Sequence, residues 1–91
     1  MPRILIIEDE TPMRTALKDV LEAEGHRALT AADGEAGLTA ALDERPDLIL
    51  LDVMMPKLDG FAVCAELRRL SNPVPILMLT AKGQVEDRVM G

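Results

Sequence analysis

Acidic residues follow or end two apolar segments of the sequence. Glu8 and Asp9 directly follow the run "RILII", and Asp52 ends the run "DLILLD". A hydroxyl residue, Thr80, ends a third apolar run, "PVPILMLT". Carboxylates supply oxygen atoms, which are the ligands that hard cations such as Mg²⁺ prefer. The types and positions of these residues therefore point to chemistry at the ends of apolar segments.

Clustered carboxylates repel one another, and the repulsion can be relieved in two ways. A divalent cation can bind between them, or they can share a proton, which strongly raises the pKa of one of them. A carboxylate beside Mg²⁺ is also a nucleophile for phosphoryl groups and then forms an aspartyl phosphate. Any one of these acids could equally be a solvated surface residue, so their meaning depends on whether the fold brings them together.

The apolar runs alternate with segments of helical spacing. Short continuous apolar runs predict buried strands, at 3–7, 27–31, 47–52 and 73–80. Apolar residues spaced at i, i+3 and i+4 predict helices, at 11–25, 33–44 and 59–71, with a fourth beginning at 83–91. This order favours an α/β fold with a parallel sheet and helices on both of its faces.

N-caps and inward faces can be assigned to the predicted helices. Thr11, Asp33 and Asp59 have the side chains that N-cap positions favour. The residues expected to face the core are Met13, Ala16, Leu17, Val20 and Leu21 in the first helix, Ala36, Leu38, Ala41 and Leu42 in the second, and Val63, Cys64, Leu67 and Leu70 in the third.

In an open parallel sheet, ligands bind beyond the carboxyl ends of the strands. The first predicted strand is followed by Glu8 and Asp9, the third ends in Asp52, and the fourth ends in Thr80. Neighbouring strands lie about 4.8 Å apart, so side chains at adjacent strand ends can share one ion. We therefore expect these residues to form one site at the carboxyl edge of the sheet.

Length, charge and cysteine content limit the number of domains, the binding partners and the cellular compartment that the protein can have. The 91 residues fit one domain. The net charge of −6 argues against binding of nucleic acid or anionic membrane by this segment. Cys64 is the only cysteine, which excludes an intramolecular disulfide and favours a reducing compartment. The first apolar run is too short for a signal peptide or a membrane span, so we expect a cytoplasmic protein.

The sequence resembles the receiver domain of bacterial two-component response regulators. The matching stretches are "IIEDE", "LLDVMMPKLDG" and "ILMLTAK", and the resemblance extends over all 91 residues. It implies a flavodoxin-like, doubly wound parallel sheet with the strand order 2-1-3-4, in which the family's fifth strand and last helix are missing. It also implies that residues 1–91 form one receiver domain, truncated at its C-terminus and without an effector domain.

The resemblance assigns a role to each candidate residue. Asp52 is the phosphoryl acceptor, and Thr80 is the hydroxyl that senses the phosphoryl group. Glu8 and Asp9 match the acidic pair that holds Mg²⁺, and Asp52 and the backbone carbonyl of Met54 complete the metal site. The implied partner is a sensor histidine kinase, and the implied output is an effector that binds DNA. The domain itself is not expected to be an enzyme.

One part of the family's site has no counterpart in this sequence. The family carries a lysine after its fifth strand and an aromatic switch residue on that strand, and Lys57 and Lys82 are expected to be loop residues that replace neither. We therefore expect phosphorylation from a small phosphodonor to be slow. We also expect an exposed, apolar edge on the fourth strand, which would join chains into a homodimer or a larger oligomer.

Two other functions fit parts of the sequence. The chain could be an interaction or scaffold module that is not phosphorylated, and a Mg²⁺ titration would separate this function from the first. A Mg²⁺-dependent phosphohydrolase would also use an aspartate at a strand end. Such an enzyme requires a second aspartate, its general acid, two residues after the nucleophile, and this sequence has Met54 there.

Overall fold

The computed structural model describes residues 2–52, 60–79 and 85–88. Its sheet has the strand order β2-β1-β3-β4-β5. The strands are β1 (Arg3–Ile7), β2 (Arg27–Ala31), β3 (Leu48–Asp52), β4 (Ile76–Leu79) and β5 (Val85–Arg88). The first four are parallel, and β5 runs antiparallel to β4. The predicted α/β fold and the predicted order of the parallel strands are confirmed.

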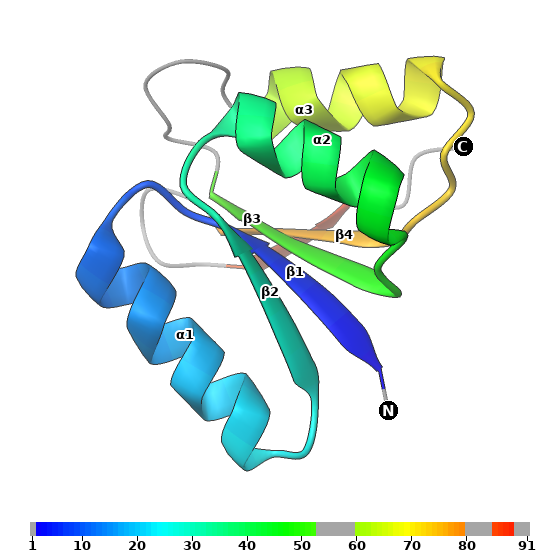
Figure 1. Ribbon diagram of the computed structural model, residues 1–91. Helices are drawn as coiled ribbons and strands as arrows, with labels where there is room; N and C mark the ends of the chain where they lie inside the picture. The colour runs from blue at the N-terminus through cyan, green and yellow to red at the C-terminus, as the bar shows by residue number, and fades with distance from the viewer. Residues whose placement is uncertain (1, 53–59, 80–84, 89–91) are drawn as a thin grey trace.

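Helices cover both faces of this sheet. The helix α1 (Thr11–Ala23) packs over β1 and β2 on one face, whereas α2 (Gly34–Glu44) and α3 (Gly60–Arg69) lie together on the other (Figure 1). β1 runs between β2 and β3, and the side chains of Leu5, Ile6 and Ile7 are all fully buried. Burial on both faces explains why this strand is a continuous apolar run and not an alternating one.

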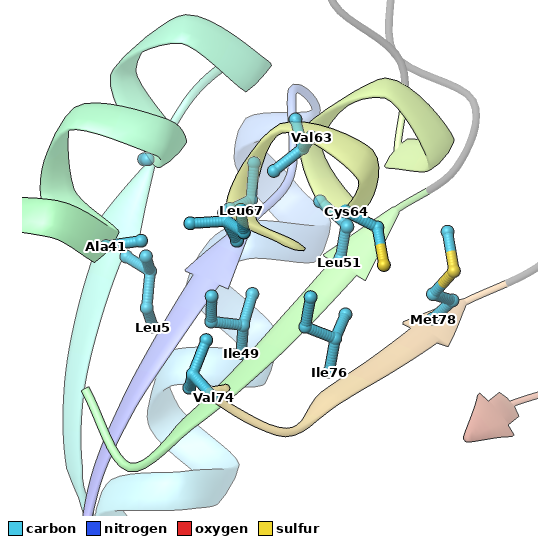
Figure 2. Close-up of a cluster of buried hydrophobic side chains, with 12 residues drawn as sticks. Leu5, Ala41, Ile49, Leu51, Val63, Cys64, Leu67, Val74, Ile76 and Met78 are labelled. Atoms are coloured by element: carbon cyan, nitrogen blue, oxygen red, sulfur yellow. The ribbon is translucent and has the colours of Figure 1, made fainter. Parts of the chain in front are cut away.

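The main core lies between the sheet and the pair α2 and α3. Aliphatic side chains of β1, β3 and β4 meet Val63, Cys64 and Leu67 of α3 there (Figure 2). Gly37 allows α2 to approach β1 closely, because a Cβ atom at that position would overlap with the side chain of Ile7. The carboxyl ends of β1 and β3 are therefore fixed by the close packing of α2 and α3 on the sheet.

The predicted inward faces of the helices are partly wrong. α1 has no buried residue, and the side chains of Met13 and Val20 are 48% and 60% exposed. Among the described elements this helix packs mainly on β2 and β1, which leaves much of its surface exposed. In α2 the buried residues are Gly34, Gly37 and Ala41.

The glycines of α2 explain that difference. Ala36 and Leu42 were expected to face the core and are exposed, because the two glycines let the backbone itself approach the sheet. In α3 the expected burial of Val63, Cys64 and Leu67 is confirmed, whereas Leu70, just past the end of the helix, is 43% exposed. Asp59, the expected N-cap of α3, lies outside the described residues.

The helix predicted at 83–91 is wrong for its described part, because Val85–Arg88 form the strand β5. This strand pairs with β4, with Leu79 opposite Val85 and Ile76 opposite Arg88. The physical reason is the apolar outer edge of β4, whose backbone groups need hydrogen-bond partners. The exposed β4 edge expected from the sequence is thus taken by β5. The homodimer itself stays a prediction, but its route through a free β4 edge is wrong.

Membrane insertion through a helix finds no support in the described segments. None of α1, α2 and α3 combines the length and the apolar character that a membrane-spanning helix requires.

Candidate functional site at the carboxyl edge

The register of the parallel strands brings the predicted site residues to one edge of the sheet. Ile7 of β1 pairs with Leu51 of β3. The residues that follow them, Glu8 and Asp52, therefore lie side by side on two neighbouring strands. Asp52 in turn pairs with Leu79, the last residue of β4. The carboxyl ends of parallel strands lie on the same side of the sheet, and the backbones of neighbouring strands lie about 4.8 Å apart. The register therefore places Glu8 and Asp52 next to each other at the carboxyl ends of β1 and β3, and the shared site of Glu8, Asp9 and Asp52 stays a prediction.

Glu8 has an environment that is unusual for an acid. Its residue is 3% exposed, and it is the one charged residue among the buried residues of the described structure. Its Oε2 atom accepts a hydrogen bond of 2.9 Å from the backbone N–H of Glu10. Its own N–H donates to the carbonyl of Ala31 on β2 at 3.1 Å. Burial of a carboxylate is costly without such partners, so the fold holds this acid at a defined position.

The next residues of the β1–α1 connection differ in burial. Asp9 is half-buried, and Glu10 is exposed. Glu10 occupies the N-cap position of α1 without a side-chain cap, so the prediction of Thr11 as N-cap is wrong by one residue. Thr11 Oγ1 instead accepts a hydrogen bond of 3.2 Å from Arg14 Nη2. Glu10 is thus a connecting residue, and the metal-binding candidates on this connection are Glu8 and Asp9.

Arg14 is a part of this site that no sequence motif indicates. Its Nη1 atom donates to the backbone carbonyl of Glu8 at 2.9 Å and lies 3.4 Å from the carbonyl of Asp9. The signal in the sequence is weak, since an arginine in the first turn of a helix is normally a solvated residue. Only the fold shows that this side chain reaches back to the end of β1.

Asp33 stands near the same edge, just after β2, and its role is structural. Its Oδ1 atom accepts a hydrogen bond of 2.8 Å from the N–H of Ala36, which caps α2 as the sequence predicted. This carboxylate is therefore already occupied by the helix terminus, and we do not include it in the site.

The residues at the edge fit a hard divalent cation by their chemistry. Glu8 and Asp9 supply carboxylate oxygens, which suit Mg²⁺, and Mg²⁺ needs only one or two protein carboxylates. Glu8 is held in place by its bond to Glu10, which favours a preformed site. Within the described side chains no three acids, histidines or cysteines gather as a metal cluster. The side chain of Asp52, and all of Met54 and Thr80, lie outside what the structure describes.

Known families and proteins share this sequence pattern. The profile of the response regulator receiver domain matches residues 4–91. The transcriptional regulatory protein AfsQ1 of Streptomyces coelicolor is 50% identical over 91 residues, which are 100% of this chain and 40% of that protein. The alkaline phosphatase synthesis transcriptional regulatory protein PhoP of Bacillus subtilis is 51% identical over 89 residues, 98% of this chain and 37% of that protein. The chain thus spans about two fifths of the length of these relatives.

Solved structures with the same fold were found as well. The receiver domain of the Francisella response regulator 1452 superposes with a TM-score of 0.87 at 28% identity, covering 92% of this chain and 69% of that one. The response regulator protein TrrA of Thermotoga maritima, solved in complex with Mg²⁺ and BeF, gives a TM-score of 0.84 at 38% identity. That match covers 89% of this chain and 70% of the other.

Proposed function

Because the chain belongs to the response regulator receiver family of two-component systems, we propose that it accepts a phosphoryl group on Asp52 from a sensor histidine kinase. The observation that carries the proposal is the strand register, in which Ile7 pairs with Leu51 and the acids that follow both residues meet at one edge. A phosphoryl acceptor at the end of a central strand is held rigidly, because both neighbouring strands and the core below fix the backbone of β3.

The proposed reaction is a transfer between two side chains. An oxygen of the Asp52 carboxylate attacks the phosphorus atom of a phosphohistidine on the kinase. The P–N bond breaks as the new P–O bond forms, and the leaving electron pair stays on the imidazole nitrogen. Such transfers depend mainly on positioning and on stabilisation of the charge on the transferred group. The fold supplies the positioning through β3.

Glu8 and Asp9 are the proposed ligands of Mg²⁺, together with Asp52 and the carbonyl of Met54. Mg²⁺ would supply positive charge that offsets the negative charge of the phosphoryl oxygens. Support comes from the buried, hydrogen-bonded Glu8 and from the similar TrrA protein, which was solved with Mg²⁺ and BeF. Thr80 follows Leu79, the strand partner of Asp52, and is the proposed hydroxyl that senses the phosphoryl group.

The proposed output is control of transcription by a DNA-binding effector. The curated relatives AfsQ1 and PhoP are named as transcriptional regulatory proteins, and this chain corresponds to about two fifths of each. The net charge of −6 makes the present segment itself a poor binder of DNA. We propose the cytoplasm as the compartment, where the free, buried thiol of Cys64 would stay reduced.

The proposal can be tested by intact-mass spectrometry after incubation with acetyl phosphate and Mg²⁺. We expect a gain of one phosphoryl group that requires Mg²⁺ and disappears in Asp52→Asn. Asp19→Asn, an exposed acid on α1, is the matched control and should gain the group as the wild type does. No phosphorylation of the wild type under any of these conditions would favour the scaffold function. Equal phosphorylation of Asp52→Asn would overturn the assignment of the acceptor.

A further inference from the structure

One side chain ties the end of β1 to the beginning of α1. Arg14 lies in the first turn of α1, and its guanidinium donates to the carbonyl of Glu8 at 2.9 Å and to Thr11 Oγ1 at 3.2 Å. A third, longer contact of 3.4 Å joins it to the carbonyl of Asp9. The planar guanidinium carries several N–H donors in a fixed geometry, so it can hold neighbouring oxygens at once.

The two carbonyls have a special relation to Asp9. The carbonyl of Glu8 belongs to the peptide group that precedes the Cα atom of Asp9, and the carbonyl of Asp9 belongs to the group that follows it. The orientations of these two peptide planes set φ and ψ of Asp9, and the backbone dihedrals fix the direction of its Cβ atom. A side chain that holds both carbonyls therefore limits where the Asp9 carboxylate can lie.

The same peptide group also reaches Glu8. The carbonyl of Asp9 and the N–H of Glu10 belong to one planar peptide unit, and this N–H donates to Glu8 Oε2 at 2.9 Å. The contacts thus run from the Arg14 guanidinium through the peptide to the Glu8 carboxylate. In the described structure the hydrogen bonds of Arg14 go to carbonyl and hydroxyl oxygens and not to carboxylates, so Arg14 orders the acidic pair without forming an ion pair with it.

We propose that Arg14 is a positioning residue for magnesium binding: it fixes the peptide groups around Asp9 and so presents the carboxylates of Glu8 and Asp9 in the geometry that Mg²⁺ requires. The inference rests on the proposed function. Mg²⁺ demands a near-ideal octahedral arrangement of oxygens, which makes its affinity sensitive to small errors in ligand position. Residues that orient metal ligands typically change metal affinity by about 10- to 100-fold when they are removed.

The test compares Arg14→Met, Arg14→Lys and the control Lys18→Met. Lys18 lies on the same helix and pairs with Glu22 at 3.4 Å, so its replacement removes the same charge without touching the β1–α1 connection. Mg²⁺ affinity is measured by isothermal titration calorimetry, and exchange of the Glu10 amide hydrogen is measured by NMR without metal. We expect Arg14→Met to weaken Mg²⁺ binding about tenfold or more and to speed exchange of the Glu10 amide.

The control variants separate positioning from charge and from folding. Arg14→Lys keeps the charge but loses the fork of donors, so its affinity should fall between those of the wild type and Arg14→Met. Lys18→Met should match the wild type in both measurements. The inference is overturned if folded Arg14→Met or Arg14→Lys binds Mg²⁺ as the wild type does, or if Lys18→Met weakens binding as much as Arg14→Met.

Failure of the proposed function would look different. If the wild type binds no Mg²⁺, the proposed metal site is wrong, and the metal role of Arg14 is wrong with it. Exchange of the Glu10 amide would then still decide whether Arg14 holds the β1–α1 connection. If Arg14→Met does not fold, Arg14→Lys carries the comparison of Mg²⁺ affinities.

Discussion

Charged residues have different partners at the two ends of the parallel strands, which we call the amino edge (before the strands begin) and the carboxyl edge (after they end). At the amino edge, the Arg3 side chain pairs with Glu44 at 3.1 Å, and the backbone N–H of Arg3 donates to Asp47 Oδ2 at 2.8 Å. At the carboxyl edge, three acids follow one another at positions 8–10, and the nearby cation, Arg14, bonds to carbonyl oxygens. At the amino ends of the strands the acids are thus separate and each bonds a donor of Arg3, whereas at the carboxyl end of β1 several acids lie next to one another in the sequence.

The contacts of Asp47 and Asp33 make these two acids structural, whereas the two adjacent acids at the end of β1 favour a ligand role for Asp9 and, beside its bond to the Glu10 N–H, for Glu8. An acid that satisfies a backbone donor or a base contributes to stability whether or not a ligand is present. Acids that lie close together repel one another, and the repulsion raises the energy of the folded protein. Proteins keep such clusters of like charges where a bound cation or a reaction depends on them. The cluster then lowers the stability of the folded protein in favour of its function.

The largest expected effect comes from an acid at the carboxyl edge. Asp9→Asn should lower the affinity for Mg²⁺ by more than about tenfold, because a charged oxygen ligand is lost. The same change should leave the free energy of unfolding in metal-free buffer nearly unchanged, because Asp9 is a half-buried residue of the β1–α1 connection and no core contact depends on its charge. Calorimetry and urea unfolding measure the two quantities. A loss of stability without a loss of Mg²⁺ affinity would mean that Asp9 is a structural acid.

An acid at the amino edge should show the opposite pattern. Asp47→Ala removes the acceptor of the Arg3 N–H and should lower the free energy of unfolding by about 1 kcal/mol, with Mg²⁺ affinity unchanged. Asp43→Ala, an exposed acid on α2, is the control and should change stability less. The comparison between the edges would break down if Asp47→Ala weakened Mg²⁺ binding as Asp9→Asn does.

The smallest effect is expected for a surface pair that lies away from both edges. The hydrogen bond from Arg69, at 2.9 Å from Nε to Glu66 Oε1, lowers the pKa of Glu66 below its ordinary value of 4.5, although partial burial of the carboxyl acts in the opposite sense. A lowered pKa means that the pair stabilises the folded protein above the ordinary pKa. That contribution is lost as the pH falls through the lower, folded value. Arg69 has its pKa raised by the same hydrogen bond, which matters only in strong alkali.

Glu66→Gln should therefore lower the melting temperature slightly at neutral pH. The difference from the wild type should shrink in acid, when the wild-type carboxylate is protonated as well. The effect is small because exposed ion pairs contribute little in water. Thermal unfolding at pH 7 and in acid measures it. A difference that grows on acidification would contradict the direction of this pKa shift.

The sequence predicted most of the fold because the relevant signals are local. The apolar runs gave β1 and β3 nearly at their observed bounds, and Asp33 was found as the cap of α2 from its residue type. The helix faces were less predictable. Ala41 and Leu38 of the predicted inner face of α2 do meet the core. Gly37 packs against Ile7, and a glycine contributes nothing to an apolar pattern, so this part of the inner face was missed.

The remaining errors have tertiary causes. Val85–Arg88 form a strand because the edge of β4 is available for pairing, and no local pattern records that edge. At the candidate site, the positions of the acids 8 and 9 at the end of β1 were predictable because strand ends are visible in the sequence. Arg14 was missed because its bonds reach the carbonyl groups of the β1–α1 connection, which any sequence of residues would carry.

The assignment of Asp52 is tested most directly by locating the phosphoryl group on the chain. After incubation with acetyl phosphate and Mg²⁺, borohydride reduction converts an acyl phosphate of aspartate into homoserine, and peptide mass spectrometry identifies the residue. We predict homoserine at position 52, dependent on Mg²⁺ and lost in Asp52→Asn. Homoserine at Asp9 in place of Asp52, or reduction that is equal with and without Mg²⁺, would contradict the proposed site.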